Sequence, residues 1–174
     1  MARSFNTAGG GAATNRNGLE FERGTDLREA FKEHPRYKLV GDGVVDRATD
    51  KEVGTLYAKN KLYKNLLEAR GFNYKDYISK KLLPDDALLV GGTVHIIEKK
   101  YQAGAGSVDE KLQTCHFKLR QYTKLIKPLG LRVEFHFLLS DWFKAPSYRD
   151  VLEYIEETGC NYFFHEIPLD KLGL

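Results

Sequence analysis

The chain of 174 residues has little cysteine and no long hydrophobic run. Its two cysteines, Cys115 and Cys160, show neither metal-ligand spacing nor the pattern of a disulfide framework, which favours a cytoplasmic protein. No apolar run approaches the ~20 residues of a membrane-spanning helix, so we expect no membrane contact. The glycine run at 9–11 lacks the Lys-Ser/Thr pair that a phosphate-binding P-loop requires. These absences argue against disulfide-rich, membrane-spanning and P-loop proteins.

The overall composition is that of a globular protein. Hydrophobic residues make up 42% of the chain and charged residues 29%, and the length is sufficient for one hydrophobic core. Residues 1–14 are mostly small or polar and lack the apolar segment of a secretory signal, so we expect a flexible tail there. We interpret residues 15–174 as a single domain.

Basic residues concentrate in one segment, although the net charge of the chain is only +3. Residues 59–81 contain seven lysines and arginines against two acidic residues, with aromatic residues interleaved. Such a segment can lie along nucleic-acid phosphates, with its rings against sugars or bases. The alternative is a solvated helix face whose aromatic residues belong to the core. The candidate phosphate contacts are Lys59, Lys61, Lys64, Lys80 and Lys81.

The spacing of apolar residues predicts alternating helices and strands. Helices are expected over residues 19–34, 61–70, 107–126 and after Pro146, where apolar residues recur every three to four positions. Strands are expected over residues 87–90, 94–101, 131–139 and 161–167, with short strands and turns over 37–58. Alternation within 131–139 predicts one buried face. The strand–helix–strand steps favour parallel pairing beside an antiparallel hairpin, hence an α/β fold with a mixed central sheet flanked by helices.

Residues 84–102 carry the chemistry of the chain. Gly91-Gly92 between two apolar runs predicts a tight hairpin turn. Side chains alternate along a strand, so Glu98 and Lys100 share one face, while Lys99 points to the other face and is expected to be solvated. The hairpin would bring Asp85 or Asp86 near Glu98. Buried carboxylates need a partner, and a hard cation such as Mg²⁺ suits their oxygen atoms.

At these residues the sequence resembles the PD-(D/E)XK nuclease superfamily, in particular its type II restriction-endonuclease-like members. Pro84-Asp85 is similar to the first half of the motif, and Glu98-Lys99-Lys100 is similar to the second. Residues 17–22 and 106–114 also resemble segments of these enzymes. The resemblance implies a restriction-endonuclease-like αβββαβ core and Mg²⁺-dependent hydrolysis of DNA phosphodiester bonds, with Mn²⁺ as a substitute ion.

The resemblance also implies roles for individual residues. Asp85 and Glu98 would bind the metal ion, with Asp86 competing for the role of Asp85. Lys100 would position or activate the attacking water, since a lysine beside a cation can have a depressed pKa and approach a general base.

Further residues are candidates for supporting roles. Glu22 would supply a third carboxylate from the first helix, or it is a surface glutamate. Gln102 shares the face of Glu98 and would touch the scissile phosphate, or it is an exposed strand end. Lys111 would approach a phosphate. Four histidines show no metal-ligand spacing, and we interpret them as structural or surface residues: His95, His116, His136 and His165.

The expected partner is double-stranded DNA. Cutting two strands with one site per chain favours a homodimer or a partner subunit. Alternatives with the same chemistry are a Holliday-junction resolvase, a repair nuclease and a phage nuclease. An alternative of a different class is a non-catalytic nucleic-acid-binding module on the same scaffold.

Overall fold

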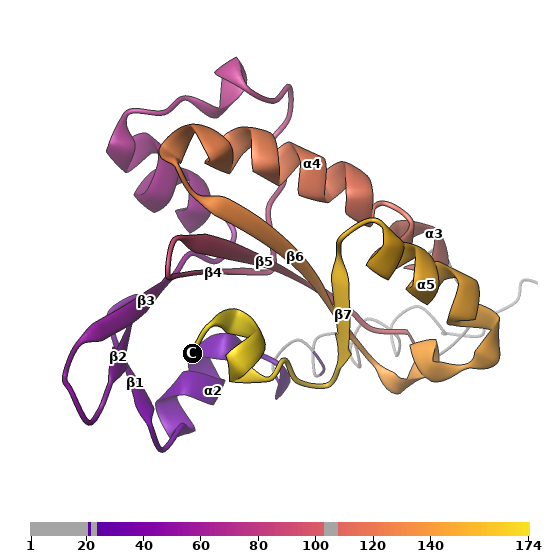
Figure 1. Ribbon diagram of the computed structural model, residues 1–174, viewed down its shortest axis with the longest axis horizontal. Coiled ribbons are helices and arrows are strands. Elements are labelled where there is room, and N and C mark those ends of the chain that lie inside the picture. The colour runs from indigo at the N-terminus through magenta and orange to yellow at the C-terminus, as the bar shows by residue number, and fades with distance from the viewer. Residues whose placement is uncertain (1–20, 22–23, 103–107) are drawn as a thin grey trace, which may run out of the picture.

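A seven-stranded mixed sheet organises the protein, with its strands in sequential order across the sheet (Figure 1). The structure, a computed structural model, describes residues 21, 24–102 and 108–174. Strands β1 to β5 pair antiparallel, and β5, β6 and β7 pair parallel. The predicted α/β class and mixed sheet are therefore confirmed. The strands are β1 (Tyr37–Val40), β2 (Gly43–Asp46), β3 (Glu52–Leu56), β4 (Asp86–Val90), β5 (Thr93–Lys100), β6 (Arg132–Leu139) and β7 (Asn161–Phe164).

Helices cover both faces of the sheet and divide the core in two. One apolar cluster lies between the sheet, residues 62–78, α4 and α5. The other lies between the sheet, α2 and the C-terminal turn Leu169–Leu172. Figure 1 shows α4 above β5 and β6 in this view, with α2 and the C-terminus below the sheet. The helices are α2 (Leu27–Glu33), α3 (Val108–Leu112), α4 (Cys115–Ile126) and α5 (Arg149–Glu157).

The predicted hairpin is present as β4–β5. Gly91 and Gly92 both have positive φ, 53° and 83°, which is the backbone of the type I′ turn that two-residue hairpins favour. The turn pairs Val90 with Thr93 and so fixes the register of the whole hairpin. Gly54 on β3 allows close approach from the neighbouring strand, because an added Cβ would lie 2.8 Å from Val90 Cγ2.

The helical segment after the hairpin differs from the prediction of one continuous helix. It is split, since α3 ends at Leu112 and α4 begins at Cys115. The Thr114 hydroxyl donates to the carbonyl oxygen of Lys111 at 2.6 Å, which supports a turn between the two helices. The predicted capping residue Ser107 lies outside the described residues.

Strand β6 also differs from its prediction. From Phe135 onward its residues are buried on both faces, so the prediction of one buried face is wrong. The reason is tertiary packing, because Phe137 belongs to the cluster under α4 and Leu138 to the cluster over α2. Within the part of the chain that the structure describes, no helix is both long and apolar enough to cross a bilayer.

Candidate functional site

The β4–β5 hairpin brings Asp85, Glu98 and Lys100 together at one edge. Asp86 pairs with Ile97, so continuing the register by one residue places Asp85 opposite Glu98. The Oδ2 atom of Asp85 accepts a 2.8 Å hydrogen bond from the backbone N–H of Lys99. Lys100 Nζ lies 2.8 Å from Glu98 Oε2 and 4.0 Å from Asp85 Oδ2. One ammonium group therefore lies between two carboxylates.

Helix α4 adds a second cation that the sequence analysis missed. Lys118 Nζ lies 2.8 Å from Glu98 Oε2, the atom that Lys100 also contacts. Burial acts to raise the pKa of Glu98, which is 6% exposed, but the charges and hydrogen bonds of the two lysines outweigh it and lower that pKa. The carboxylate is therefore ionised at neutral pH. Lys118 lies four residues before the buried Tyr122, so both lie on the same side of α4. This spacing was the sequence signal that Lys118 lies near the sheet.

Tyr122 is the second contribution of α4 that sequence reasoning missed. Its ring is fully buried in the core, and its hydroxyl finds no hydrogen-bond partner among the described residues. Burial, followed by the nearby charge of Glu98, raises the pKa of Tyr122. The phenol is therefore protonated at neutral pH.

The opposite face of the hairpin holds a separate ion pair between Asp86 and Lys99. Lys99 Nζ lies 2.8 Å from Asp86 Oδ2, and both residues are buried. The prediction that Lys99 is solvated is wrong, because α2 and the C-terminal turn cover this face. Burial raises the pKa of Asp86, with the charge of Lys99 opposing that shift. Asp85, not Asp86, is the carboxylate that the register places beside Glu98.

The remaining candidates are dispersed. Gln102 is 4% exposed, so it is not an exposed strand end, and its backbone N–H donates to Ser140 Oγ at 3.2 Å. Lys111 is exposed on α3, and among the residues that the structure describes no ion pair joins it to the carboxylates. Glu22 lies outside the described residues.

The lysines of the basic segment differ in exposure and in their partners. Lys59, Lys64 and Lys80 are exposed. Lys61 pairs with Asp42 at 2.7 Å. Lys81 lies over the rings of two tyrosines, 4.8 Å from each centroid. Four of the five predicted phosphate contacts are therefore exposed, with Lys61 also ion-paired, and Lys81 is partly covered.

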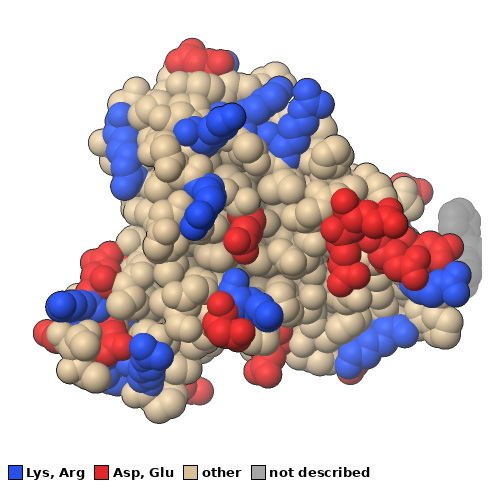
Figure 2. Space-filling view, in the orientation of Figure 1, with Lys and Arg blue, Asp and Glu red and all other residues tan. Residues whose placement is uncertain are grey.

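Charge is unevenly distributed over the surface (Figure 2). Basic side chains are spread over the upper part of this view, where residues 61–81 and α4 lie in Figure 1, while an acidic patch covers α5. The exposed acidic residues of α5 are Asp150, Glu153, Glu156 and Glu157. A polyanion would be repelled by α5 and attracted to the other part of this surface.

Two of the histidines come together with a glutamate, which the sequence analysis did not foresee. His95 on β5 lies beside His136 on β6, with a ring-nitrogen separation of 3.1 Å, and Glu134 faces both rings. His95 is 39 positions from Glu134 and 41 from His136 in the sequence. Spacing along the sequence therefore gave no sign that the three residues meet; the pairing of β5 with β6 brings them together.

Comparison with models of known protein families found no match to this chain, and a search of the curated proteins found no significant relative.

Proposed function

We propose that the protein is a Mg²⁺-dependent DNA endonuclease of the restriction-endonuclease-like type. The observation that carries the proposal is the cluster of Asp85, Glu98 and Lys100 at one edge of the hairpin. The proposal requires two carboxylates and a lysine on the same side of two paired strands. The register of β4 and β5 supplies them in that arrangement.

The donor atoms suit a hard cation. Asp85 and Glu98 provide carboxylate oxygens, which Mg²⁺ prefers. Asp85 is partly exposed, with 30% of its side chain accessible, so an ion can reach it from solvent. Glu98 is ionised and already surrounded by positive charge from Lys100 and Lys118. Asp85 is thus open to an ion from solvent, whereas at Glu98 an ion would have to displace an ammonium group.

The protein's own groups have distinct tasks in this proposal. Asp85 and Glu98 would hold the ion, and the ion when bound would polarise the phosphate and lower the pKa of water. Lys100 would turn from Glu98 to orient the attacking water and to offset negative charge on the phosphate. Lys118 would keep Glu98 ionised while the site is open.

The order of elements supports the same proposal. Helix α2 precedes the antiparallel strands, the hairpin leads through α3 and α4 to β6, and β6 pairs parallel to β5. An αβββαβ arrangement is contained in this order, with further strands at both edges. The exposed lysines of residues 59–80 would lie along the DNA backbone. Type II-like cleavage of both strands would involve a second copy or a partner subunit.

Plasmid cleavage with Mg²⁺ tests the proposal. The full chain should convert supercoiled plasmid to nicked or linear products, and EDTA should stop the reaction. Glu98→Gln and Lys100→Met should each lower the rate by at least about 100-fold, since general acid–base and metal-binding groups contribute on that scale. Glu157→Gln, at an exposed position on α5, is the matched control. Equal cleavage by wild type and Glu98→Gln would show that the proposed site is wrong.

A non-catalytic nucleic-acid-binding module is the second candidate, and one observation favours it. Glu98 already has two lysine partners, so the cluster is neutralised without any ion. For this function, the wild-type chain would bind duplex DNA but leave plasmid intact at every Mg²⁺ or Mn²⁺ concentration. A branched substrate cut much faster than linear duplex would instead favour the junction-resolvase alternative.

A further inference from the structure

Three side chains converge on the face of the sheet opposite to Glu98. His95 lies on β5, and Glu134 and His136 lie on β6. In the parallel register His95 pairs with Glu134, and Ile97 pairs with His136. Alternate residues of a strand share a face, so all three side chains project on the side of Ile97, which packs in the cluster with α2.

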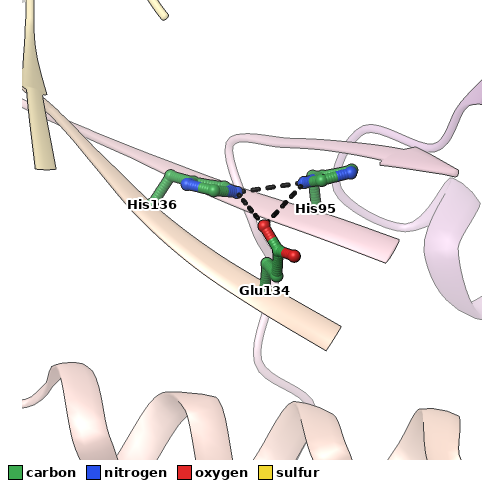
Figure 3. Close-up of side chains that lie close together, drawn as sticks. All are labelled: His95, Glu134 and His136. Atoms are coloured by element: carbon green, nitrogen blue, oxygen red, sulfur yellow. Dashed lines mark hydrogen bonds and ion pairs between the residues drawn. The ribbon is translucent and has the colours of Figure 1, made fainter. Parts of the chain in front are cut away.

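The ligand-type atoms of these residues face one another (Figure 3). His95 Nδ1 lies 3.1 Å from His136 Nε2. Glu134 Oε2 lies 3.5 Å from His95 Nδ1 and 3.7 Å from His136 Nε2. A tetrahedral ion with ligand bonds of about 2.0–2.1 Å separates its ligand atoms by about 3.3–3.4 Å. The three separations lie around this value, so one ion fits between the atoms with little movement.

The two histidine rings have too few N–H groups to join all three ligand atoms by hydrogen bonds. His95 is 4% exposed and His136 is 1% exposed, and such burial favours neutral rings. Each neutral ring has one N–H and one acceptor nitrogen. A single N–H can join the two facing ring nitrogens, so no second ring proton lies between them and the Glu134 oxygen, whose other partner is solvent because its side chain is 48% exposed. A cation bound by all three atoms would remove this mismatch.

We propose that His95, Glu134 and His136 form a binding site for a divalent transition-metal ion of the Zn²⁺ class. Two imidazole nitrogens and one carboxylate suit Zn²⁺ and its first-row neighbours, whereas Mg²⁺ prefers oxygen atoms alone. The Glu134 side chain is 48% exposed, so the ion can exchange with solvent and keep water as a fourth ligand. The site would link β6 to β5, the strand that carries Glu98 and pairs parallel with β6.

Titration of the tag-free full chain with Zn²⁺ tests the proposal. Isothermal calorimetry should show one Zn²⁺ bound per chain, and bound Zn²⁺ should raise the midpoint of thermal unfolding. Glu134→Gln should weaken Zn²⁺ binding by at least about tenfold, since even residues that only orient a metal ligand contribute that much. Because Glu134 is half exposed, this variant should fold even where His136→Gln does not. His116→Gln, at an exposed position on α4, is the matched control and should bind as the wild type does.

Three results would overturn this proposal. The first is no Zn²⁺ binding by the wild type, which would leave the two rings joined by a simple hydrogen bond. The second is equal Zn²⁺ affinity in wild type and Glu134→Gln. The third is loss of Zn²⁺ binding in Glu98→Gln with retention in Glu134→Gln, which would place the ion at the hairpin carboxylates. Since the readouts are binding and thermal stability, the outcome is independent of nuclease activity.

Discussion

Lys118 on α4 and Glu98 on β5 form an ion pair of 2.8 Å that joins a helix to the strand carrying the candidate site. Lys100 contacts the same Glu98 oxygen at 2.8 Å from the strand itself. The carboxylate is buried, and the two ammonium groups keep it ionised. An incoming metal ion would therefore compete with both ammonium groups for this oxygen.

Replacing Lys118 by methionine should raise the pKa of Glu98. Burial would then be opposed by one ammonium group instead of two. Glu98 must be ionised to hold a cation, so the rising limb of the Mg²⁺-dependent cleavage rate should move to higher pH. Above that limb, the Mg²⁺ concentration for half-maximal rate should fall, because a competing cation has been removed. The pH–rate profile and an NMR titration of the Glu98 carboxyl measure these effects.

Lys124→Met is the control for this change, because Lys124 is exposed on the same helix. Its pH–rate profile should superimpose on that of the wild type. An unchanged Glu98 titration in Lys118→Met would contradict the electrostatic role given to Lys118.

Replacing Lys99 by methionine should destabilise the protein. Asp86 and Lys99 are 7% and 9% exposed and form a 2.8 Å ion pair. Removing one partner of a buried pair leaves an uncompensated charge and costs about 3–5 kcal/mol. Burial already raises the pKa of Asp86, and loss of Lys99 should raise it further. Urea unfolding at several pH values measures the free energy of unfolding.

The pH dependence of Lys99→Met has a defined sign. The pKa of Asp86 is higher in the folded protein than in the unfolded chain. At pH values between these two pKa values the folded protein binds a proton that the unfolded chain does not. The destabilisation should therefore be largest at neutral pH and diminish as pH falls through the raised pKa of Asp86. The double variant Asp86→Leu with Lys99→Met should cost less than the sum of the single changes. Additive costs would mean that the two residues do not act as a pair.

The hairpin and the grouping of side chains at its edge could be predicted because the relevant signals are local. Gly91 and Gly92 adopt the positive φ that the two-residue turn requires. Strand alternation alone placed Glu98 with Lys100. The choice of Asp85 over Asp86 needed the register, and a two-residue turn at 91–92 fixes that register by pairing residues 90 and 93.

Contributions from distant elements could not be predicted in the same way. Lys118 reaches Glu98 only because α4 packs over β5 and β6. Lysine is mostly found at protein surfaces. Lys99 is buried because α2 and the C-terminal turn cover its face of the sheet. The approach of His95 to His136 depends on β5 and β6 being parallel neighbours. Each of these relations is set by tertiary packing and has no local sequence pattern.

Protein stability should depend on pH through His136. Burial, followed by the neighbouring His95, lowers the pKa of His136 to about 4 from its ordinary value near 6.5. Between these values the unfolded chain binds a proton that the folded protein does not, so stability rises with pH by up to about 1.4 kcal/mol per pH unit for this group. The contribution is complete above pH 6.5 and is lost as pH falls toward 4.

Metal-free His136→Gln is the comparison that isolates this effect. In chelator-treated protein, the variant should show a shallower loss of unfolding free energy than the wild type between pH 6.5 and pH 4, while His116→Gln, at an exposed position on α4, should match the wild type. Parallel curves for wild type and His136→Gln would mean that the ring protonates freely in the folded protein.

Lys81 should behave differently from Lys64 and Lys80, although all three belong to the basic segment. Lys64 and Lys80 are exposed, so replacing either by alanine should weaken DNA binding similarly for all sequences and reduce the salt slope by about 1. Lys81 lies over the rings of Tyr63 and Tyr74, so Lys81→Ala should cost on the order of 1 kcal/mol of stability. Fluorescence anisotropy at several salt concentrations and urea unfolding separate the two effects. If Lys64→Ala and Lys80→Ala leave affinity and salt slope unchanged, the segment is a solvated helix face, and DNA would have to approach the hairpin from another side.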